Sequence, residues 1–348
     1  MTQRTLAGLL AVPLVIGLLV AAFTQPLPYV SYEPGLTVDV LDDYDDHEII
    51  TVDGHRTYPD EGELRMTTVY VSRPRAEVSL MELMGDWISR DSAVYPYSAV
   101  YDEDETPEES EQEGAAEMVS SQDTAIAVAL TELGYELEPG PSVLLIEQGA
   151  PADGPLQVGD LFLEVGGEEV ATSDELVAAI QAAPPGEPLR FRVLRAGKEV
   201  DAVLTPRRND GKAQIGVQVG TSYTFPFHIE LDLDPAIGGP SAGLMFALGV
   251  YDKLTPGSLT GGAVVAGTGT ISPDGAVGPI GGVQQKIAAA RDAGAELFMV
   301  PPDNCAEALG APHGDVRLVR AATMHSAVEA IEAWTADPGA DLPSCQDE

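Results

Sequence analysis

Basic residues are scarce in this chain. Its 348 residues include 18 lysines and arginines against 56 acidic residues, which gives a formal net charge of −38. Phosphate backbones repel so acidic a protein, and nucleic acid is therefore excluded as a partner. The acidity is spread along the sequence, with one dense run at 102–117, and is typical of a solvated surface.

Several signatures of cofactor chemistry are also missing. The chain has no GxxxxGK[ST] loop to hold nucleotide phosphates and no HExxH zinc motif. Its five histidines do not fall at the spacing of metal ligands. We therefore expect no metal, no cofactor and no ATP-driven step.

Cysteine occurs only twice, at Cys305 and Cys345. Two interpretations are open: one disulfide that ties down the C-terminal tail, or two unpaired thiols. A disulfide persists in an oxidising compartment, outside the cytoplasm.

One long apolar run stands out at the N-terminus. The 19 residues from Thr5 to Phe23 carry no charge, and that length crosses a bilayer as a helix. Pro13 is tolerated in membrane helices, and Arg4 keeps the N-terminus inside. We expect a single-pass signal anchor at residues 1–25 that leaves the remaining chain extracytoplasmic. A signal peptide cleaved near LVAAFTQ is the alternative.

Residues 26–133 mix strand-like and helical patterns. The stretches HEIITVDG and LRMTTVYVSRP predict strands, because they are rich in Val, Ile, Thr and Tyr. The segment SLMELMGDWISRD predicts a helix at 79–91. The acidic run is expected to form a mobile loop at 101–117. A helix should follow from about Glu117 to Leu133 and end at a glycine.

Residues 143–206 change to short strands around one helix. The strands are VLLIEQG, DLFLEVGG, LRFRVLRAG and EVDAVLTPR, and the helix at 173–183 begins at Ser173 or Asp174 as its N-cap. This pattern predicts a small, partly open barrel.

The order of these elements, the GD-initiated strand and the RAGKEV hairpin resemble a bacterial PDZ domain, which we place at 134–208. The resemblance implies a groove for peptide C-termini, with Leu133, Gly134 and Tyr135 nearest the carboxylate. A PDZ fold that serves only as a spacer or gate is the alternative.

The segment IGGPSAGLMFAL places Ser241 at the mouth of a helix predicted at 241–252. The positive end of that helix and the free N–H groups near it would stabilise a developing oxyanion. Pro240 has no N–H, so the donors are expected in the amide of Ser241 and in Gly238 or Gly239. A serine that only caps the helix is the alternative.

The segment GPIGGVQQKIAAA places Lys286, one of only four lysines, in a helix predicted at 282–293. Its neighbours at helical spacing are small or apolar, without a carboxylate. These neighbours are Gly282, Val283, Ala289 and Ala290. Burial among them would lower the lysine pKa and let the neutral amine act as a base for Ser241. A solvent-exposed lysine is the alternative.

PSAG, the TG of AGTGT and PIGGVQQK follow one another as in the proteolytic domain of Lon-type proteases, which residues 212–335 resemble. The resemblance implies Ser241 as nucleophile, Lys286 as general base and Thr268 as a hydroxyl that orients the lysine amine. It also implies a homo-oligomeric ring. With its anchor and PDZ unit, the whole chain resembles the membrane-anchored PDZ and Lon-domain proteins of Gram-positive bacteria.

Two positions depart from the Lon pattern. Gly239 stands where many Lon enzymes have an aspartate, and Thr270 stands where their T-G-E has a glutamate; both changes bear on activation or gating. The Lon ATPase unit is missing as well, so the expected substrates are unfolded or exposed segments of extracytoplasmic proteins. A Ser-His-Asp triad with His228 is a second way to activate the serine, although a histidine that begins an alternating strand is ordinarily a strand residue.

The sequence thus predicts a multidomain α/β (α+β) serine endopeptidase with a transmembrane helix, a PDZ-like β-barrel and a Lon-type proteolytic α/β domain. The expected units are the anchor at 1–25, a mixed region at 26–133, the PDZ-like domain at 134–208, the proteolytic domain at 212–335 and a tail at 336–348. A non-catalytic PDZ scaffold and a peptidase that cleaves only itself are the alternatives.

Overall fold

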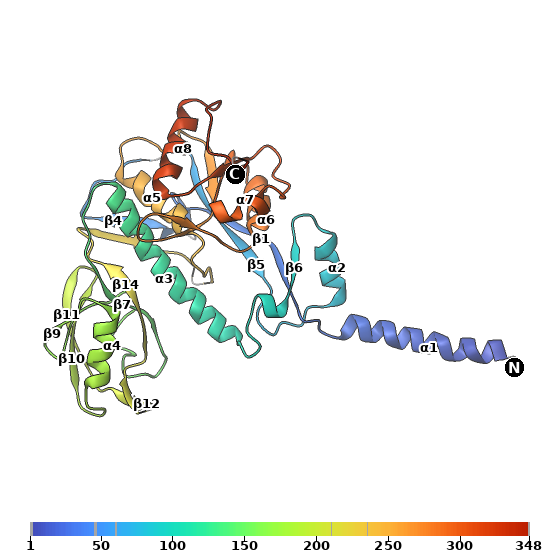
Figure 1. Cartoon of the computed structure of the whole chain (residues 1–348), viewed down its shortest axis with the longest axis horizontal. Coiled ribbons are helices and arrows are strands. Elements are labelled where there is room, and N and C mark those ends of the chain that lie inside the picture. Colours follow the sequence, from blue (N-terminus) through green and yellow to red (C-terminus); the bar gives the residue numbers. More distant parts are fainter. Residues whose placement is uncertain (1–2, 45–46, 60, 210, 235, 347–348) are drawn as a thin grey trace.

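The structure is a computed structural model, and it has a larger α/β unit, a smaller β-rich unit and a projecting N-terminal helix (Figure 1). The residues it describes are 3–44, 47–59, 61–209, 211–234 and 236–346. The helices are α1 (Gln3–Thr24), α2 (Leu80–Ile88), α3 (Pro107–Glu132), α4 (Ser173–Ala182), α5 (Gly243–Leu254), α6 (Val283–Asp292), α7 (Cys305–Ala308) and α8 (Met324–Ala336).

The larger unit is built on a mixed six-stranded sheet. Its order is β20 (Arg317–Arg320), β19 (Leu297–Val300), β16 (Val264–Gly267), β5 (Glu63–Val71), β1 (Tyr29–Asp39) and β6 (Ala93–Pro96). The four strands from β20 to β5 run parallel, whereas β1 pairs antiparallel with β5 and β6. Half of this sheet therefore comes from the N-terminal region, which the sequence had suggested was a unit of its own.

The smaller unit is a second sheet with one covering helix, α4. Its order is β11 (Lys198–Leu204), β10 (Leu189–Arg195), β8 (Leu161–Val165), β7 (Pro139–Ile146) and β14 (Val217–Tyr223), with β9 (Glu168–Glu169) beside β8. A separate hydrophobic core, which includes Phe162, Leu176 and Phe191, lies between this sheet and α4. The strand β14, placed with the proteolytic domain from the sequence, belongs to this sheet because it pairs along the whole length of β7.

Short two-stranded ladders complete the fold. They are β2 (Asp43–Tyr44) with β3 (His47–Glu48), β4 (Ile50–Asp53) with β15 (His228–Leu231), β12 (Arg207–Asn209) with β13 (Lys212–Gln214), and β17 (Thr270–Ile271) with β18 (Val277–Gly278). Because β4 and β15 pair, the chain on either side of the smaller unit is joined, and that unit is an insertion in the larger one.

The prediction of a loop at 101–117 was wrong for most of that segment. α3 begins at Pro107 after a complete capping box, in which the Thr106 hydroxyl accepts from the Glu109 amide and the Glu109 carboxylate accepts from the Thr106 amide. Proline suits the first helical turn, and acidic residues there interact favourably with the positive helix end. The acidic run is thus the start of a 26-residue helix.

The cap of α4 also differs from the prediction. Its N-cap is Thr172, whose hydroxyl accepts from the Glu175 amide, rather than Ser173 or Asp174.

α1 covers the segment for which an anchor was predicted. Within the part of the chain that the structure describes, none of the helices combines the length and the hydropathy that a bilayer crossing requires. The predicted apolar run from Thr5 to Phe23 lies partly outside this description, which omits the side chains of residues 3–8, 19 and 21–24.

The two cysteines form a disulfide, with their Cα atoms 5.0 Å apart. Cys305 and Cys345 are both buried in a core that also holds Val283 and Ile287 of α6. The tail is thereby tied down beside α6, as in the first of the two interpretations.

Removing this disulfide should destabilise the protein strongly. Replacing Cys305 and Cys345 by alanine is expected to lower the free energy of unfolding by about 4 kcal/mol, because a loop closed over a sequence separation of 40 is released in the unfolded chain. Urea unfolding measures this loss, and reduction of the wild-type protein should reproduce it. Unchanged stability in both experiments would contradict the assignment.

Candidate active site

Ser241 lies just ahead of α5, on a glycine-led turn. Gly239 has a backbone φ of 88°, a left-handed conformation that glycine adopts without steric penalty. The Ser241 carbonyl accepts hydrogen bonds from the Gly269 amide at 2.9 Å and the Thr268 hydroxyl at 3.0 Å. These bonds to the β16–β17 connection hold Ser241 outside the helix, so α5 begins at Gly243 and not at the serine as predicted.

Two hydrogen bonds join the helix α3 to this turn. The Ser121 hydroxyl donates to the Pro240 carbonyl at 3.1 Å, and the Gly239 amide donates to the Gly114 carbonyl at 2.8 Å. One of the two glycine amides expected as oxyanion donors is therefore engaged with α3.

Lys286 reaches Ser241 from the first turns of α6. Its Nζ lies 2.6 Å from the Ser241 Oγ and 3.0 Å from the Thr268 Oγ1. Gly282, with φ of 69°, precedes the helix and lets the chain enter it sharply. The structure thus brings together the three residues that the sequence singled out.

The lysine amine is cut off from water. Lys286 is only 2% exposed, and burial lowers its pKa from the ordinary 10.5 to about 7. No acidic group contributes to this shift, which agrees with the carboxylate-free surroundings predicted from the sequence. Near neutral pH a large share of the protein therefore carries Lys286 as the free amine.

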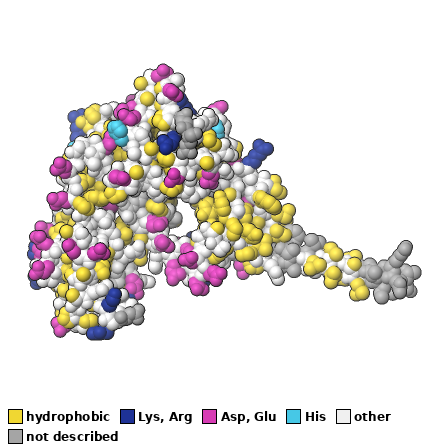
Figure 2. Space-filling model, in the orientation of Figure 1, with side chains coloured by type: hydrophobic (Ala, Val, Ile, Leu, Met, Phe, Trp, Pro, Cys, Tyr) yellow, Lys and Arg dark blue, Asp and Glu magenta, His cyan; other side chains and the backbone are white. Residues whose placement is uncertain are grey.

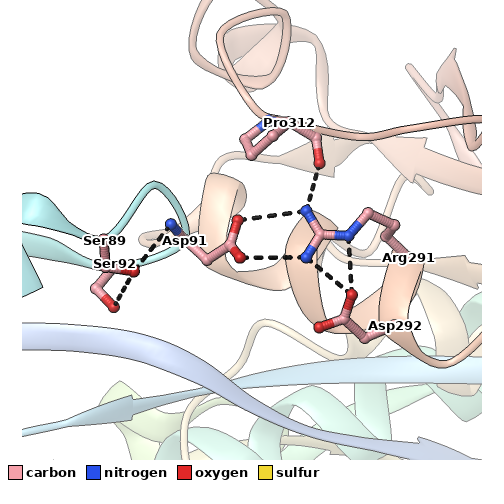
Figure 3. A network of polar contacts seen from close by, with 6 residues as sticks. All are labelled: Ser89, Asp91, Ser92, Arg291, Asp292 and Pro312. Atoms are coloured by element: carbon pink, nitrogen blue, oxygen red, sulfur yellow. Dashed lines mark hydrogen bonds and ion pairs between the residues drawn. The ribbon is translucent and has the colours of Figure 1, made fainter.

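Both ends of α6 are fixed by polar contacts. Before the helix, the Asn304 side chain accepts from the Ile280 amide and donates to the Ile280 carbonyl, both at 2.9 Å. In the last turn of the helix, Arg291 donates to both carboxylate oxygens of Asp91 and to the Pro312 carbonyl (Figure 3). Lys286 consequently projects from a helix held in one position.

A cleft of about 220 Å³ opens at Ser241 and Lys286, which we call the dyad. Five consecutive residues of β5, from Met66 to Tyr70, line it together with Ser241 and Lys286. Since side chains alternate along a strand, a continuous run of lining residues presents the strand edge. On this edge β5 pairs with β16, and the pairing ends at Met66. No described strand pairs with the same edge of β5 beyond Met66, so it is open there.

The smaller unit carries a second groove, of about 320 Å³, between α4 and β14. Val177 and Ile180 of α4 face Gly216 to Val219 across it. Among the described strands, β14 lies at one edge of its sheet. The sequence predicts a strand here, in the segment AQIGVQVG, but assigned it to the next domain because it follows the β11 segment.

The residues predicted to bind a peptide carboxylate lie elsewhere. Leu133 and Tyr135 follow α3 and pack against the core of the larger unit, and Gly134 lies between them. None of the three lines the groove at β14. Their assigned role stays a prediction.

The other candidates stay apart from the dyad. His228 lies on β15 beside Glu230, and it does not line the cleft at Ser241. Thr270, where Lon enzymes have a glutamate, begins β17. Among the described residues no group of three His, Cys, Asp or Glu side chains could hold a metal ion.

Comparison with known families agrees with both units. The PDZ domain family matches residues 119–205, and the family of the Lon protease (S16) C-terminal proteolytic domain matches residues 234–331. The chain carries a PDZ domain and an S16 proteolytic domain. The predicted domain types are confirmed, and the C-terminal unit is a serine peptidase domain of family S16.

The similar proteins match only in part. Lon protease 2 of Bacillus subtilis (strain 168) is 39% identical over 80 residues, which is 23% of this chain and 14% of that protein. Zinc metalloprotease RasP of Geobacillus kaustophilus (strain HTA426) is 37% identical over 73 residues, 21% of this chain and 17% of that protein. The chain therefore spans about a sixth or less of these relatives.

Among solved structures, the PDZ domain of the SdrC-like protein from Listeria innocua is 26% identical. The match covers 23% of this chain and 92% of that structure, with a TM-score of 0.22.

Thr268 can be tested as a residue that positions the amine. Thr268→Val removes the hydroxyl that bridges Lys286 Nζ and the Ser241 carbonyl, and we expect kcat for peptide cleavage to fall by roughly tenfold to a hundredfold, with KM little changed. Thr255→Val is the matched control, because its hydroxyl bonds the Tyr251 carbonyl at the far end of α5. An equal loss in both variants would point to a structural effect.

Proposed function

We propose that this chain is an ATP-independent, membrane-anchored serine endopeptidase that cleaves unfolded or exposed segments of extracytoplasmic proteins. The contact between Ser241 Oγ and Lys286 Nζ at 2.6 Å, in a site where burial lowers the lysine pKa to about 7, carries the proposal. A lysine in that state can accept a proton from serine without help from histidine.

The proposed reaction proceeds in two halves. Neutral Lys286 accepts the proton of Ser241 while the Oγ attacks the scissile carbonyl carbon, and the resulting ammonium then gives that proton to the departing amine. A water molecule, deprotonated by the same amine, hydrolyses the acyl-enzyme and restores the serine. Thr268 keeps the Nζ directed at the Oγ through both halves.

The oxyanion would be bound by the Ser241 amide and a glycine amide of the preceding turn. Gly239 could serve only if its amide left the Gly114 carbonyl. Gly238 requires no such change and is our preferred second donor.

The open edge of β5 favours an extended substrate. A segment without structure of its own could add to this edge by main-chain hydrogen bonds, as in other strand-addition complexes. Leu36, Val69 and Ile237 line the same cleft and would receive apolar side chains. Such side chains are accessible in unfolded chains and buried in folded ones.

The PDZ domain would dock or screen substrates at the groove between α4 and β14. Its free strand and apolar helix face suit a peptide terminus. α3 connects the strand β14 to the active site. Its Asp123 side chain forms a hydrogen bond with Ser222 of β14. Two residues earlier on the same helix, the Ser121 hydroxyl donates to the Pro240 carbonyl, next to the nucleophile. Occupation of the groove could therefore influence the nucleophile turn.

The proposed location outside the cytoplasm rests on the uncharged run from Thr5 to Phe23 and on the disulfide, which an oxidising compartment maintains. A ring of chains enclosing the sites is part of the same proposal.

The pH dependence of cleavage tests the proposed base. Because the free amine is the active form, kcat/KM should rise with pH through an apparent pKa of about 7 and level off above it. A fluorogenic peptide without ionisable side chains reports this profile. A rise centred near 10.4, the ordinary value for lysine, would contradict a buried base.

Cleavage of an unfolded protein separates the enzyme from a scaffold and from a self-cleaving peptidase. Reduced casein should be degraded by the wild-type chain and left intact by Ser241→Ala and Lys286→Ala. Wild-type chain that shortens itself without touching casein would favour self-cleavage. Intact casein and intact chain in all samples would favour a PDZ scaffold.

A further inference from the structure

The short helix α2 turns an apolar face outward. The side chains of Met81, Met84, Trp87 and Ile88 are 64%, 44%, 83% and 79% exposed, respectively. Apolar side chains gathered in this way on a soluble surface ordinarily mark an interaction site.

The opposite face of α2 holds the helix on the protein. Leu83 is buried, and Asp86 accepts a hydrogen bond from the Ser31 hydroxyl of β1 at 2.6 Å. Asp86 thus faces the protein while Trp87, the largest side chain of the helix, faces outward.

α2 is fixed next to the point where α1 ends. The Leu27 amide, three residues after α1, donates to the Val78 carbonyl at 3.2 Å, and Ser79 then caps α2. The two helices are in contact. The apolar surface over α2 lies close to the end at which the projecting α1 helix joins the body of the protein (Figure 2).

The exposed side chains of α1 indicate what covers this region. Among the described part of that helix, large apolar residues are exposed at successive positions all around its axis. They are Leu9, Leu10, Val12, Leu14, Val15, Ile16, Leu18 and Val20. A second protein would cover one side of such a helix, whereas lipid surrounds every side. Lipid is therefore the occupant that suits the surface continuing onto α2.

We propose that α2 binds the membrane surface, lying in the interface beside α1 with Met81, Met84, Trp87 and Ile88 inserted among the lipids. Tryptophan favours this depth, and helices with one apolar face lie in the plane of the interface. The proposal needs α1 only to contact lipid, and it does not depend on whether α1 crosses the bilayer. It is therefore independent of the proposed transmembrane anchor.

This contact would also set the orientation of the active site. Asp91 follows α2 and pairs with Arg291, at the end of the helix that carries Lys286 (Figure 3). The membrane-bound helix and the lysine helix are thus joined by one ion pair, and the dyad would be held at a constant height above the lipid.

Tryptophan fluorescence of the full chain in phosphatidylcholine vesicles tests the proposal. The chain has two tryptophans, and Trp334 is buried in α8, so Trp334→Phe leaves Trp87 as the only tryptophan, which can be excited selectively beside the tyrosines. We expect the Trp87 emission to shift to shorter wavelength and to lose most of its intensity when the lipids carry bromine near the headgroup end of the chains. Trp87→Phe is the matched control, and its remaining emission should not respond to bromine.

Each other outcome overturns the proposal. Emission at long wavelength that aqueous acrylamide quenches freely would place Trp87 in water. A blue shift without bromine quenching would place it against a second copy of the chain. Should Trp334→Phe fold poorly, the difference in bromine quenching between wild type and Trp87→Phe gives the same answer. Whether α1 crosses the bilayer is tested separately, by the protection of the vesicle-bound chain against an added protease. The proposed peptidase activity is tested by casein cleavage. Each proposal therefore has its own readout.

Discussion

Ser241→Ala is expected to abolish peptide cleavage, with kcat/KM reduced on the order of 10⁴-fold or more. Of the two described hydroxyls that contact Lys286 Nζ, those of Ser241 and Thr268, only the Ser241 Oγ lies on the turn before α5. Without it no acyl-enzyme can form, and Lys286 has no proton to accept. Initial rates with a fluorogenic peptide measure the loss.

Two further variants make this result specific. Lys286→Ala should lose as much activity as Ser241→Ala, and the double variant should lose no more, because the two groups act as one unit. Ser272→Ala is the matched control, since its hydroxyl bonds within the turn between β17 and β18. Residual activity above roughly a tenth of wild type in Ser241→Ala would remove this serine from the mechanism.

Lys286→Met is expected to be inactive and yet more stable than the wild type. The pKa of Lys286 is about 7 in the folded protein against 10.5 for an ordinary lysine, so below pH 7 folding must accommodate a charge in a buried site. The lowered pKa reduces the free energy of unfolding of the wild type by about 5 kcal/mol at pH 6 and by about 2 kcal/mol at pH 9. Methionine has a similar shape and carries no charge to desolvate.

The sign of this effect depends on pH in a defined way. Between pH 7 and 10.5 the unfolded chain binds a proton at Lys286 that the folded protein does not, so wild-type stability should rise with pH across this window. The advantage of Lys286→Met, measured by urea unfolding, should therefore shrink from pH 6 to pH 9. Lys253→Met is the control, because it breaks an ion pair with Glu48 and should give no stabilisation. A constant difference between pH 6 and pH 9 would contradict the lowered pKa.

The sequence was most informative about local chemistry. The small and apolar neighbours of Lys286 predicted a buried amine, and the structure has that amine 2% exposed beside Ser241. Helical periodicity likewise located α2, α4 and α6 within a few residues, because each has a regular apolar face. The types of the two domains, inferred from their motifs, are confirmed by the family matches.

Long-range pairing was not predictable in the same way. Nothing in the alternating residues of β1 and β5 specifies that they extend a sheet begun by β16, β19 and β20, far along the chain. The partner of β14 was hidden for the same reason. Charge was misleading at 102–117, where cap residues determined the helix start despite the acidic run. The hydrogen bond from Gly239 to Gly114 likewise depends on how α3 packs.

The protonation state of Lys286 is the central claim, and NMR can measure it directly. The chain has only four lysines, so labelling their Cε carbons with ¹³C gives four signals, and Lys286→Met assigns the one of interest. Titration of that signal should give a pKa of about 7. A Lys286 signal that titrates near 10.4, the ordinary value for lysine, would contradict a neutral lysine base and with it the proposed Ser-Lys mechanism.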